Sequence, residues 1–494
     1  MRASGVLLPI SSLPSKYGIG SFSKSAYDFV DKLRMAGQTF WQILPIGPTG
    51  YGDSPYQSFS TFAGNPYFID LEQLIEEGLL TKEECDELDF GSNPRYIDYE
   101  KIYLSRFPLL WKAYLRSKCR FQDEFIRFTK ANAFWLNDYA LYMAIKDLFK
   151  GASWDKWEDD IKFRKPMALQ EYERRLDREI EYYKYIQFLF FNQWSNLKKY
   201  ANDNGILIMG DIPIYVALDS ADAWSHPDLF QFDENLKPIA LAGCPPDSFS
   251  DDGQFWGNPL YRWEGHKESK YEWWISRIAY SFKLYDYLRI DHFKGFDEYY
   301  SIPYTSKNAR NGEWKRGPGF DFFKELESSL GKLNIIAEDL GHITNSVIDL
   351  LKMTGYPGMK VLEFAFDSKT EDSDYLPHNY DKNCVVYTGT HDNRPIKDWI
   401  RRIPKEDIDY ILNYTDKDEN DLEDINWIMI RLAMASVANI CIIPMQDYLG
   451  LGEEARINEP STVGDNWIWR LLDGDVTKDL ISKIKYMTKL YGRI

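Results

Sequence analysis

Short apolar runs, rich in β-branched residues, recur along the whole chain, and most of them are followed by turn residues or by an acid. None of the runs alternates cleanly between apolar and polar residues, which is typical of strands buried on both faces of a parallel sheet. Eight segments share this pattern: residues 5–10, 39–46, 206–210, 285–290, 334–337, 359–364, 384–387 and 440–444. We therefore expect a sheet of parallel strands.

Helical patterns lie between several of these predicted strands. Segment 23–35 repeats apolar residues at helical spacing and is followed by Gly37, a frequent helix stop. Segment 344–353 shows the same spacing. Eight parallel strands with helices between them predict an α/β fold, the (β/α)8 or TIM barrel.

The connection between the second and third predicted strands is unusually long. It runs for about 160 residues, far more than one helix needs. Strong helical patterns cover residues 123–150 and 168–204 of this connection. We expect a helical insertion subdomain over residues 50–200, on the C-terminal face of the barrel.

The connection between the third and fourth predicted strands is also long. We expect a loop insertion over residues 212–284 that lines a substrate groove on the same face. Residues 244–261 within it are rich in proline, glycine and acids, which predicts that no regular element forms there. Residues 1–494 would then make up a single catalytic domain that carries both insertions.

Composition and charge narrow the possible partners. The chain has 59 Lys and Arg against 76 Asp and Glu, a net charge of −17, which argues against nucleic acid and against an anionic membrane surface. No run approaches the roughly 20 apolar residues of a membrane helix. The N-terminal segment has no secretory signal pattern, so we expect a cytoplasmic protein.

Cysteine and aromatic usage add a little to this picture. The five cysteines are scattered and form no CxxC pair, which favours neither a zinc site nor a disulfide framework. Aromatic residues make up 16% of the chain. Their flat faces can stack on sugar rings, although large protein cores also use aromatics.

Acidic residues follow three of the predicted strands: Asp291 after the fourth, Glu338 after the fifth and Asp392 after the seventh. In a (β/α)8 barrel the residues after each strand lie on one rim. The same rim would also receive Asp211, Arg289 and His391. A single acid after a strand is more often a turn or cap residue, so the prediction of a site depends on their joint occurrence.

Two carboxyl groups on one rim can cleave a glycosidic bond with retention of configuration. This chemistry needs a nucleophile and an acid/base about 5–5.5 Å apart. Arg289 would keep Asp291 ionised and able to attack. Glu338 would need a drier site, or neighbouring carboxylates, to stay protonated for the leaving oxygen.

Two other kinds of site use similar residues. A barrel enzyme that stabilises an enolate would bind Mg²⁺ through Asp211, Asp291 and Glu338, with Lys294 as the nearest candidate base. The long loops favour an extended groove over a pocket for a small anion. A sugar-binding module without activity would not need all three acids and Arg289 together.

Longer motifs carry a resemblance to a known family, and they extend from Gly5 to about Arg470. They are LPIGPTGYGDSPYQSFSTFAGNPYFIDLE from Leu44, GDIPIY from Gly210, FWGNPLY from Phe255, RIDHFKGF from Arg289, IAEDLG from Ile336, GTHDN from Gly389 and GLGEEARIN from Gly450. Together they resemble the 4-alpha-glucanotransferases of the amylomaltase, or disproportionating enzyme, family (glycoside hydrolase family 77). The related α-amylases often have Asn-His where this chain has Tyr215 and Val216, which favours the amylomaltase branch.

The resemblance implies a role for each motif residue. Asp291 corresponds to the nucleophile, Glu338 to the acid/base and Asp392 to the residue that grips hydroxyls of the distorted sugar. The residues implied in substrate binding are Tyr56, Asp211, Trp256, Asn258, Arg289 and His391. The implied substrates are maltooligosaccharides and α-1,4-glucans, with glucose as an acceptor, and the implied reaction needs no metal or organic cofactor.

One departure from the family pattern follows the third acid. After THDN the family usually continues with an acid and Thr, whereas this chain has Arg394 and Pro395. Pro395 suits the first turn of a helix. Arg394 puts a cation near the rim, where it could change loop shape or sugar binding. An α-glucan hydrolase remains the alternative function, because the sequence does not decide whether a sugar or water takes the glucosyl group.

Overall fold

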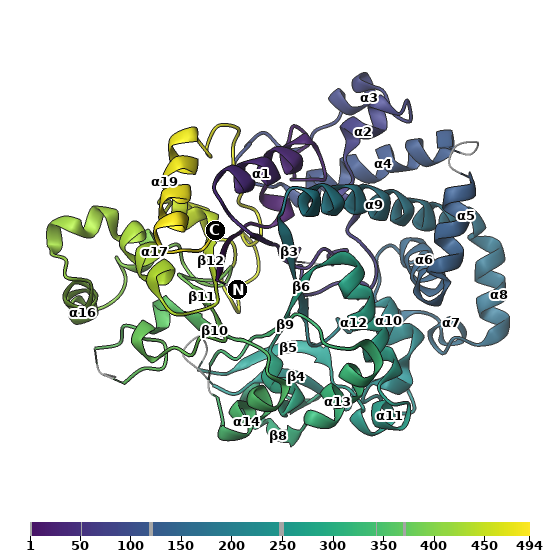
Figure 1. Cartoon of the computed structure of the whole chain (residues 1–494). Coiled ribbons are helices and arrows are strands. Elements are labelled where there is room, and N and C mark those ends of the chain that lie inside the picture. Colours follow the sequence, from purple (N-terminus) through teal and green to yellow (C-terminus); the bar gives the residue numbers. More distant parts are fainter. Residues whose placement is uncertain (1, 51, 118–121, 247–250, 342, 369–371) are drawn as a thin grey trace.

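The computed structural model describes residues 2–50, 52–117, 122–246, 251–341, 343–368 and 372–494. Its centre is an eight-stranded parallel sheet in the order β10-β11-β12-β1-β2-β3-β6-β9 (Figure 1). In chain order these strands are β1 (Ala3–Leu7), β2 (Phe40–Gln42), β3 (Leu207–Pro213), β6 (Tyr287–Asp291), β9 (Ile335–Ala337), β10 (Gly358–Val361), β11 (Cys384–Tyr387) and β12 (Ile440–Pro444). Each of the eight predicted strands overlaps one of them, and the predicted (β/α)8 barrel is confirmed.

The barrel closes between its first and last strands in sheet order, β10 and β9. Here the backbone N–H of Ala337 donates to the carbonyl of Pro357, at 3.0 Å, and the N–H of Met359 donates to Asp339 Oδ1, at 2.6 Å. A Cβ on Gly358 would lie 2.4 Å from Asp339 Oδ2. The close approach that completes the barrel therefore requires glycine at this position.

Both faces of the barrel strands are buried, and this explains their continuous apolar runs. One set of side chains fills the barrel interior: Ala3, Leu7, Phe40, Met209, Ile336, Met359, Val361, Val385, Tyr387, Ile440 and Ile442. The alternate positions, among them Val6, Trp41, Leu288 and Ile443, belong to the large core outside the barrel. Side chains along each strand still alternate between the barrel interior and the outer core, but both sets of side chains are apolar.

Helices follow the strands around the barrel. The predicted helix at 23–35 is α1 (Lys24–Met35), and the one at 344–353 is α14 (Asn345–Thr354). The others after β3 are α10 (Ala221–Ser225), α11 (Trp263–Glu268), α12 (Glu272–Leu284), α13 (Phe320–Leu330), α15 (Ile396–Trp399), α16 (Lys405–Thr415), α17 (Ile425–Ala435), α18 (Met445–Leu449) and α19 (Lys478–Leu490). Both chain termini lie beside α19 and β12 (Figure 1), where Arg493 Nη1 donates to the carbonyl of Ala3, at 3.1 Å.

The long connection between β2 and β3 is helical, as its pattern indicates. It contains α2 (Leu71–Glu76), α3 (Lys82–Asp86), α4 (Tyr99–Ser117), α5 (Gln122–Ala131), α6 (Ala133–Leu148), α7 (Asp159–Lys162), α8 (Pro166–Arg175) and α9 (Asp177–Asp203). Helix α9 crosses from the outer helices to the barrel (Figure 1), where it packs on α1 and β3. The Gln187 side chain on α9 bonds both the N–H and the carbonyl of Gly64, at 2.7 and 2.8 Å. This contact fixes the segment after β2 to α9.

A second, antiparallel sheet corrects the prediction for residues 244–261. It has the order β5-β4-β7-β8 and consists of β4 (Ala240–Cys244), β5 (Gln254–Pro259), β7 (Glu298–Pro303) and β8 (Glu313–Arg316). The expectation of no regular element was wrong for Gln254–Pro259. Strand β5 pairs with β4, which in turn pairs with β7, beyond the barrel strand β6. The turn-rich composition of residues 244–261 does not indicate this strand pairing, because β7 lies in another part of the chain.

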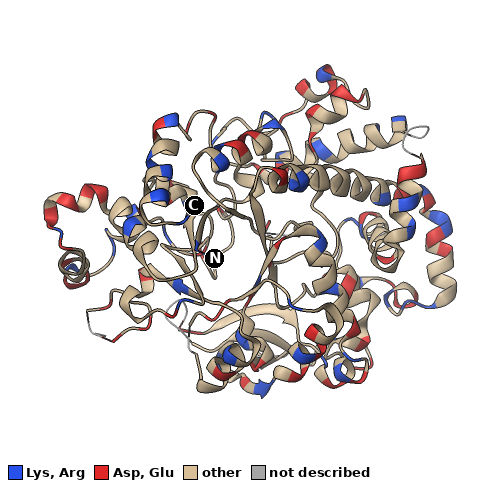
Figure 2. Ribbon diagram, in the orientation of Figure 1, with Lys and Arg blue, Asp and Glu red and all other residues tan. Residues whose placement is uncertain are grey.

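Positive and negative side chains are interspersed on the outer helices (Figure 2). Within the part of the chain that the structure describes, no helix is long and apolar enough to cross a membrane. The division of residues 1–494 into one catalytic domain with insertions at 50–200 and 212–284 remains a prediction.

Candidate active site at the strand ends

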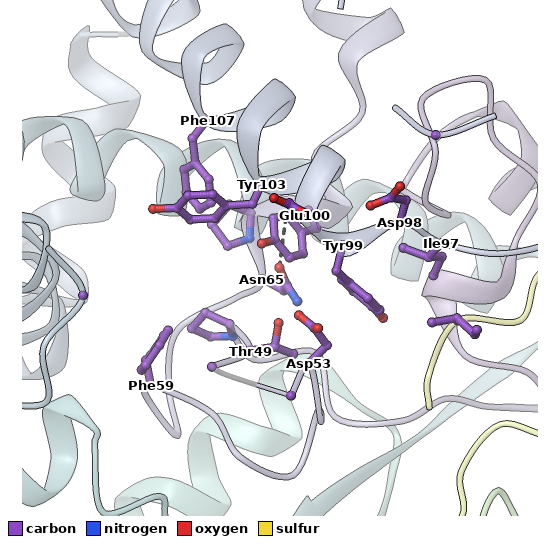
Figure 3. Close-up of a pocket in the computed structure, with 18 of the residues that line it drawn as sticks. Thr49, Asp53, Phe59, Asn65, Ile97, Asp98, Tyr99, Glu100, Tyr103 and Phe107 are labelled. Carbon is purple, nitrogen blue, oxygen red and sulfur yellow. Dashed lines mark hydrogen bonds between the residues drawn. The ribbon is translucent and has the colours of Figure 1, made fainter. Parts of the chain in front are cut away.

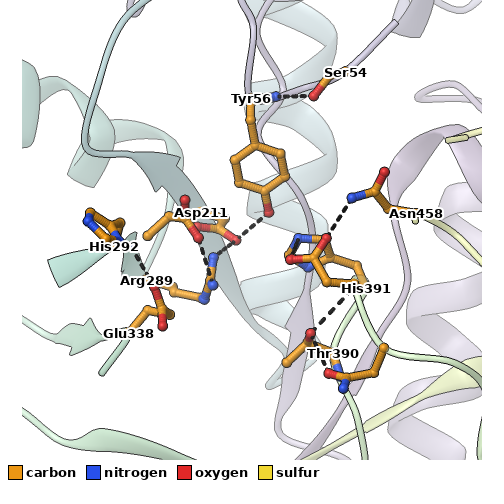
Figure 4. Close-up of polar contacts among 12 residues, drawn as sticks. Ser54, Tyr56, Asp211, Arg289, His292, Glu338, Thr390, His391 and Asn458 are labelled. Atoms are coloured by element: carbon orange, nitrogen blue, oxygen red, sulfur yellow. Dashed lines mark hydrogen bonds and ion pairs between the residues drawn. The ribbon is translucent and has the colours of Figure 1, made fainter. Parts of the chain in front are cut away.

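Strands β3 and β6 bring an arginine between two acids. In their parallel register Asp211 lies opposite Arg289, and Pro213 lies opposite Asp291. Arg289 Nη1 contacts Asp211 Oδ2 at 2.6 Å, and its Nη2 contacts Asp291 Oδ1 at 2.9 Å (Figure 4). Burial raises the pKa of Asp211. Although burial alone lowers the pKa of Arg289, the charges of Asp211 and Asp291 raise it well above its ordinary value.

Strand β9 places Glu338 beside this group. Ile290 and Ala337 are paired in the β6–β9 register, so Asp291 and Glu338 follow adjacent positions. The Glu338 carboxylate accepts from the backbone N–H of His292, at 2.6 Å, and from that of Leu340, at 2.7 Å. Burial, followed by the charge of Asp291, raises the pKa of Glu338 to about 7. The two acids therefore differ in environment as retaining chemistry requires.

The backbone at His292, which donates a hydrogen bond to Glu338, has a strained conformation. His292 has a φ of 54°, in the left-handed region that residues other than glycine seldom occupy. Such a conformation costs about 1–3 kcal/mol and is often found at functional sites. Here it accompanies the hydrogen bond from the His292 N–H to Glu338 Oε2.

The third acid, Asp392, lies on the other side of the rim, after β11. Its Oδ2 lies 3.3 Å from His391 Nε2, and its Oδ1 accepts a hydrogen bond from Asn458 Nδ2, at 2.7 Å. Tyr56 connects the two sides (Figure 4). Its hydroxyl donates to Asp211 Oδ2, at 2.8 Å, and its ring stacks on His391 with centroids 5.2 Å apart and an interplanar angle of 15°.

Strand β5 supplies the two remaining predicted binding residues. The Trp256 ring meets the His292 ring edge to face, with centroids 4.8 Å apart. Asn258 is buried and bonded at both ends of its amide. Its Nδ2 donates to the carbonyl of Val216, at 2.7 Å, and its Oδ1 accepts from Gln57 Nε2, at 3.1 Å. These contacts hold Trp256 and the loop of Tyr56 on one side of the carboxylates.

Comparison with known proteins places the chain in a family. The family model described as 4-alpha-glucanotransferase matches residues 8–475. The chain belongs to the 4-alpha-glucanotransferase family. It is 49% identical over 486 residues to the 4-alpha-glucanotransferase of Clostridium butyricum, covering 98% of this chain and 99% of that protein. It is also 49% identical over 496 residues to that of Streptococcus pneumoniae serotype 4, covering 100% and 98%.

A solved structure agrees with this assignment. The amylomaltase from Streptococcus agalactiae in complex with acarbose matches with a TM-score of 0.97 and 44% identity, and each chain is covered in full. The family and the fold predicted from the sequence are therefore both confirmed for this chain.

The Mg²⁺-enolate alternative does not fit the rim. Its three proposed ligands would have to converge on a cation, but the guanidinium of Arg289 already lies between Asp211 and Asp291. Among the described residues, no cluster of three or more His, Cys, Asp or Glu is arranged to hold a metal ion. The candidate base Lys294 has its ammonium 3.9 Å from the centroid of the Trp314 ring, on the small sheet.

Two further rim acids were not among the predicted site residues of this family member. Glu363 follows β10, and its Oε2 accepts from Asn393 Nδ2, at 3.2 Å. Burial, followed by the charge of Asp447, raises the pKa of Glu363 well above its ordinary value. Asp447 follows β12 and accepts from Thr388 Oγ1, at 2.5 Å, and from the N–H of Ile396, at 2.9 Å. The rule that strand ends share a rim would have found Asp447, whereas Glu363 was hidden inside the predicted strand 359–364, which in the structure ends at Val361.

A large aromatic cavity lies next to the loop that carries Tyr56 (Figure 3). Its volume is about 1360 Å³. It is lined by the loop after β2 and by α4, α6 and α9, with Phe59, Tyr99 and Tyr103 among its rings. Burial raises the pKa of Asp53, which also lines it, to about 6. The three catalytic acids predicted from the sequence do not line this cavity.

Proposed function

We propose that this protein transfers α-1,4-glucan segments from a donor maltooligosaccharide to the 4-OH of an acceptor, either glucose or another maltooligosaccharide. Family membership supports the reaction. The observation that carries the proposal is the pairing of Asp291, held by Arg289, with Glu338, whose pKa is raised to about 7. An ionised and a protonated carboxyl on neighbouring strand ends are what retaining glycosyl transfer needs.

In the first step Glu338 donates its proton to the glycosidic oxygen while Asp291 attacks the anomeric carbon. The bond from that carbon to the glycosidic oxygen breaks, and the leaving glucan departs with a free 4-OH. A covalent glycosyl ester remains on Asp291. Because Arg289 holds Asp291 Oδ1 at 2.9 Å, the attacking carboxylate is oriented before the donor binds.

Forming the ester also prepares the second step. Part of the raised pKa of Glu338 comes from the negative charge of Asp291. That charge disappears when Asp291 becomes an ester, so the pKa of Glu338 falls. Glu338 can then take the proton of the incoming 4-OH as this oxygen attacks the anomeric carbon and releases Asp291. Two inversions give a product with retained configuration.

The other rim residues would bind the sugars around the cleaved bond. We propose that Asp392 grips sugar hydroxyls most strongly when the ring is distorted, and that His391 assists it. Tyr56 and Trp256 offer aromatic faces. The buried Asp211 accepts from the Tyr56 hydroxyl, and the buried Asn258 accepts from Gln57 in the same loop. The aromatic cavity beside the loop of Tyr56 supports a role for the helical insertion in walling the groove.

The competing outcome is hydrolysis, in which water takes the glucosyl group. Incubation with maltotriose separates the two outcomes. Transfer yields glucose together with longer oligomers at a nearly constant number of reducing ends. A steady increase in reducing ends without longer products would overturn the proposal in favour of an α-glucan hydrolase. The Asp291→Asn variant serves as the inactive control.

A further inference from the structure

The side chain of Arg394, two residues after Asp392, pairs with acids on two different segments. Its Nη1 lies 2.8 Å from Asp398 Oδ2, on α15, and 3.6 Å from Glu453 Oε1. Its Nη2 lies 3.2 Å from Glu459 Oε1. Arg394 therefore connects α15 with the segment 450–459, which follows α18.

A second arginine strengthens this connection. Arg402 Nε contacts Asp398 Oδ1 at 2.9 Å, and its Nη2 contacts Glu453 Oε1 at 2.8 Å. Asp398 is buried, whereas Glu453 and Glu459 are largely exposed. We call these five residues, Arg394, Asp398, Arg402, Glu453 and Glu459, the arginine clamp. Networks of this kind hold a segment better than isolated surface pairs do.

The clamped segment reaches the catalytic rim through Asn458, the residue before Glu459. Asn458 Nδ2 donates to Asp392 Oδ1, at 2.7 Å. Arg456 reinforces this end, because its Nε donates to the carbonyl of Asn458, at 2.9 Å, and its Nη1 pairs with Glu459 at 2.8 Å. Glu459 is thus shared between Arg394 and Arg456, and its position fixes that of the neighbouring amide.

Asp392 needs such support because its strand does not fix it. Its side chain is 41% exposed, and the only other polar contact recorded for its carboxylate within the described residues is that with His391 Nε2, at 3.3 Å. A partly exposed carboxylate can adopt several rotamers, and only some of them would face a bound sugar. Catalytic groups lose much of their effect when they are displaced by about 1 Å.

We propose that Arg394 is a positioning residue, which through the arginine clamp holds segment 450–459 so that Asn458 orients Asp392 toward the sugar. This inference rests on the proposed role of Asp392. The Arg394 side chain faces the clamp acids, so its effect on the sugar is indirect.

The main test is charge reversal, Arg394→Glu, which places an anion among three acids. We expect kcat for maltotriose disproportionation to fall roughly 10-fold to 100-fold, with KM changed much less, because Asp392 acts mainly in the transition state. Arg394→Lys should keep most of the activity, and Arg394→Gln should lie between the two. The matched control is Arg401→Glu, an exposed arginine next to the clamp, which should retain wild-type kcat.

A double-mutant cycle with Asn458→Ala distinguishes positioning from a general structural role. If Arg394 acts through Asn458, Arg394→Gln should add little further loss in the Asn458→Ala background. Losses that multiply, or wild-type kcat in both Arg394→Gln and Arg394→Glu, would overturn the inference. Melting temperatures of all variants show whether the losses reflect unfolding.

Asp392→Asn, measured in parallel, tests the underlying role. If it keeps wild-type kcat, the proposed role of Asp392 fails, and the positioning role fails with it. If it is inactive while Arg394→Glu is unimpaired, only the clamp is wrong. Salt gives a further measurement, because 1 M NaCl shortens the screening length to about 3 Å. It should lower kcat of the wild type more than that of Asn458→Ala.

Discussion

The two sides of the catalytic rim hold their carboxylates in different ways. Asp211, Arg289 and Asp291 are linked directly from strand to strand, and Glu338 accepts backbone hydrogen bonds beside them. Asp392, across the rim, is held by Asn458, from a segment that itself depends on partly exposed ion pairs. The Asp291 side is therefore built into the barrel wall, whereas the Asp392 side is assembled from loops.

This difference means that the two sides contribute differently to the stability of the fold and to the variation of rate and specificity. A buried ion group is costly to break, because removal of one partner leaves an uncompensated charge in the core. An exposed ion pair contributes about 0–1 kcal/mol to stability, so it can change at little cost to the fold. We infer that variation in rate and specificity is more easily accommodated on the Asp392 side than on the Asp291 side.

The largest effect should come from Asp291, the proposed nucleophile. Asp291→Asn removes the group that forms the ester, and we expect kcat to fall about 10⁴-fold or more. The assay is glucose release from maltotriose. Asp297→Asn, an acid just beyond the same strand, is the control and should stay within a few-fold of wild type. An Asp291→Asn variant with substantial activity would contradict the assigned role.

Glu338→Gln should be nearly as severe for ordinary donors, with a loss of about 10²- to 10⁴-fold in kcat. The reason is that the amide cannot protonate the leaving oxygen. An α-maltosyl fluoride donor, whose leaving group needs no proton, should recover much of the first step. Equal losses with both donors would argue against Glu338 as the acid.

Arg289→Gln tests whether the Asp291 side of the rim also stabilises the fold. It leaves two carboxylates without their buried cation, and we expect about 3–5 kcal/mol of lost stability. Urea unfolding followed by tryptophan fluorescence measures this. Arg394→Gln, on the loop-built side, should cost no more than about 1 kcal/mol. Similar losses for the two variants would remove the distinction between the two sides.

The pH profile should reflect the raised pKa of Glu338. The acid form is needed for the first step and is present below about pH 7, so kcat/KM should fall as pH rises through this value. With the fluoride donor, this alkaline limb should be weak or absent. An alkaline limb that is identical for both donors would assign it to another group.

The smallest effect is expected at Glu363, the half-buried glutamate that follows β10. Burial, followed by the charge of Asp447, raises its pKa well above the ordinary value. Because Glu363→Gln keeps the size of the side chain and an oxygen that can accept from Asn393 Nδ2, activity should change less than about threefold. Comparison with Glu338→Gln isolates proton transfer from hydrogen bonding. A large loss would show that Glu363 takes part in the chemistry.

Much of this molecule could be predicted from local pattern. The eight apolar runs correspond to the barrel strands because burial on both faces leaves a direct mark on the sequence. Asp291, the last residue of β6, and Glu338, the first residue after β9, were found because strand ends share a rim. Strand β5 was missed because its partner β4 is joined in turn to β7, and β7 (Glu298–Pro303) lies far along the chain from β4.

The sequence by itself determined the fold class, the family and the positions of the three acids. Only the tertiary structure decided which groups touch. It placed Arg289 between Asp211 and Asp291, gave Glu338 its raised pKa, and brought Asn458 to Asp392 from 66 residues along the chain. Strand register and loss of water around a charge depend on residues far apart in the chain, and no local pattern records them.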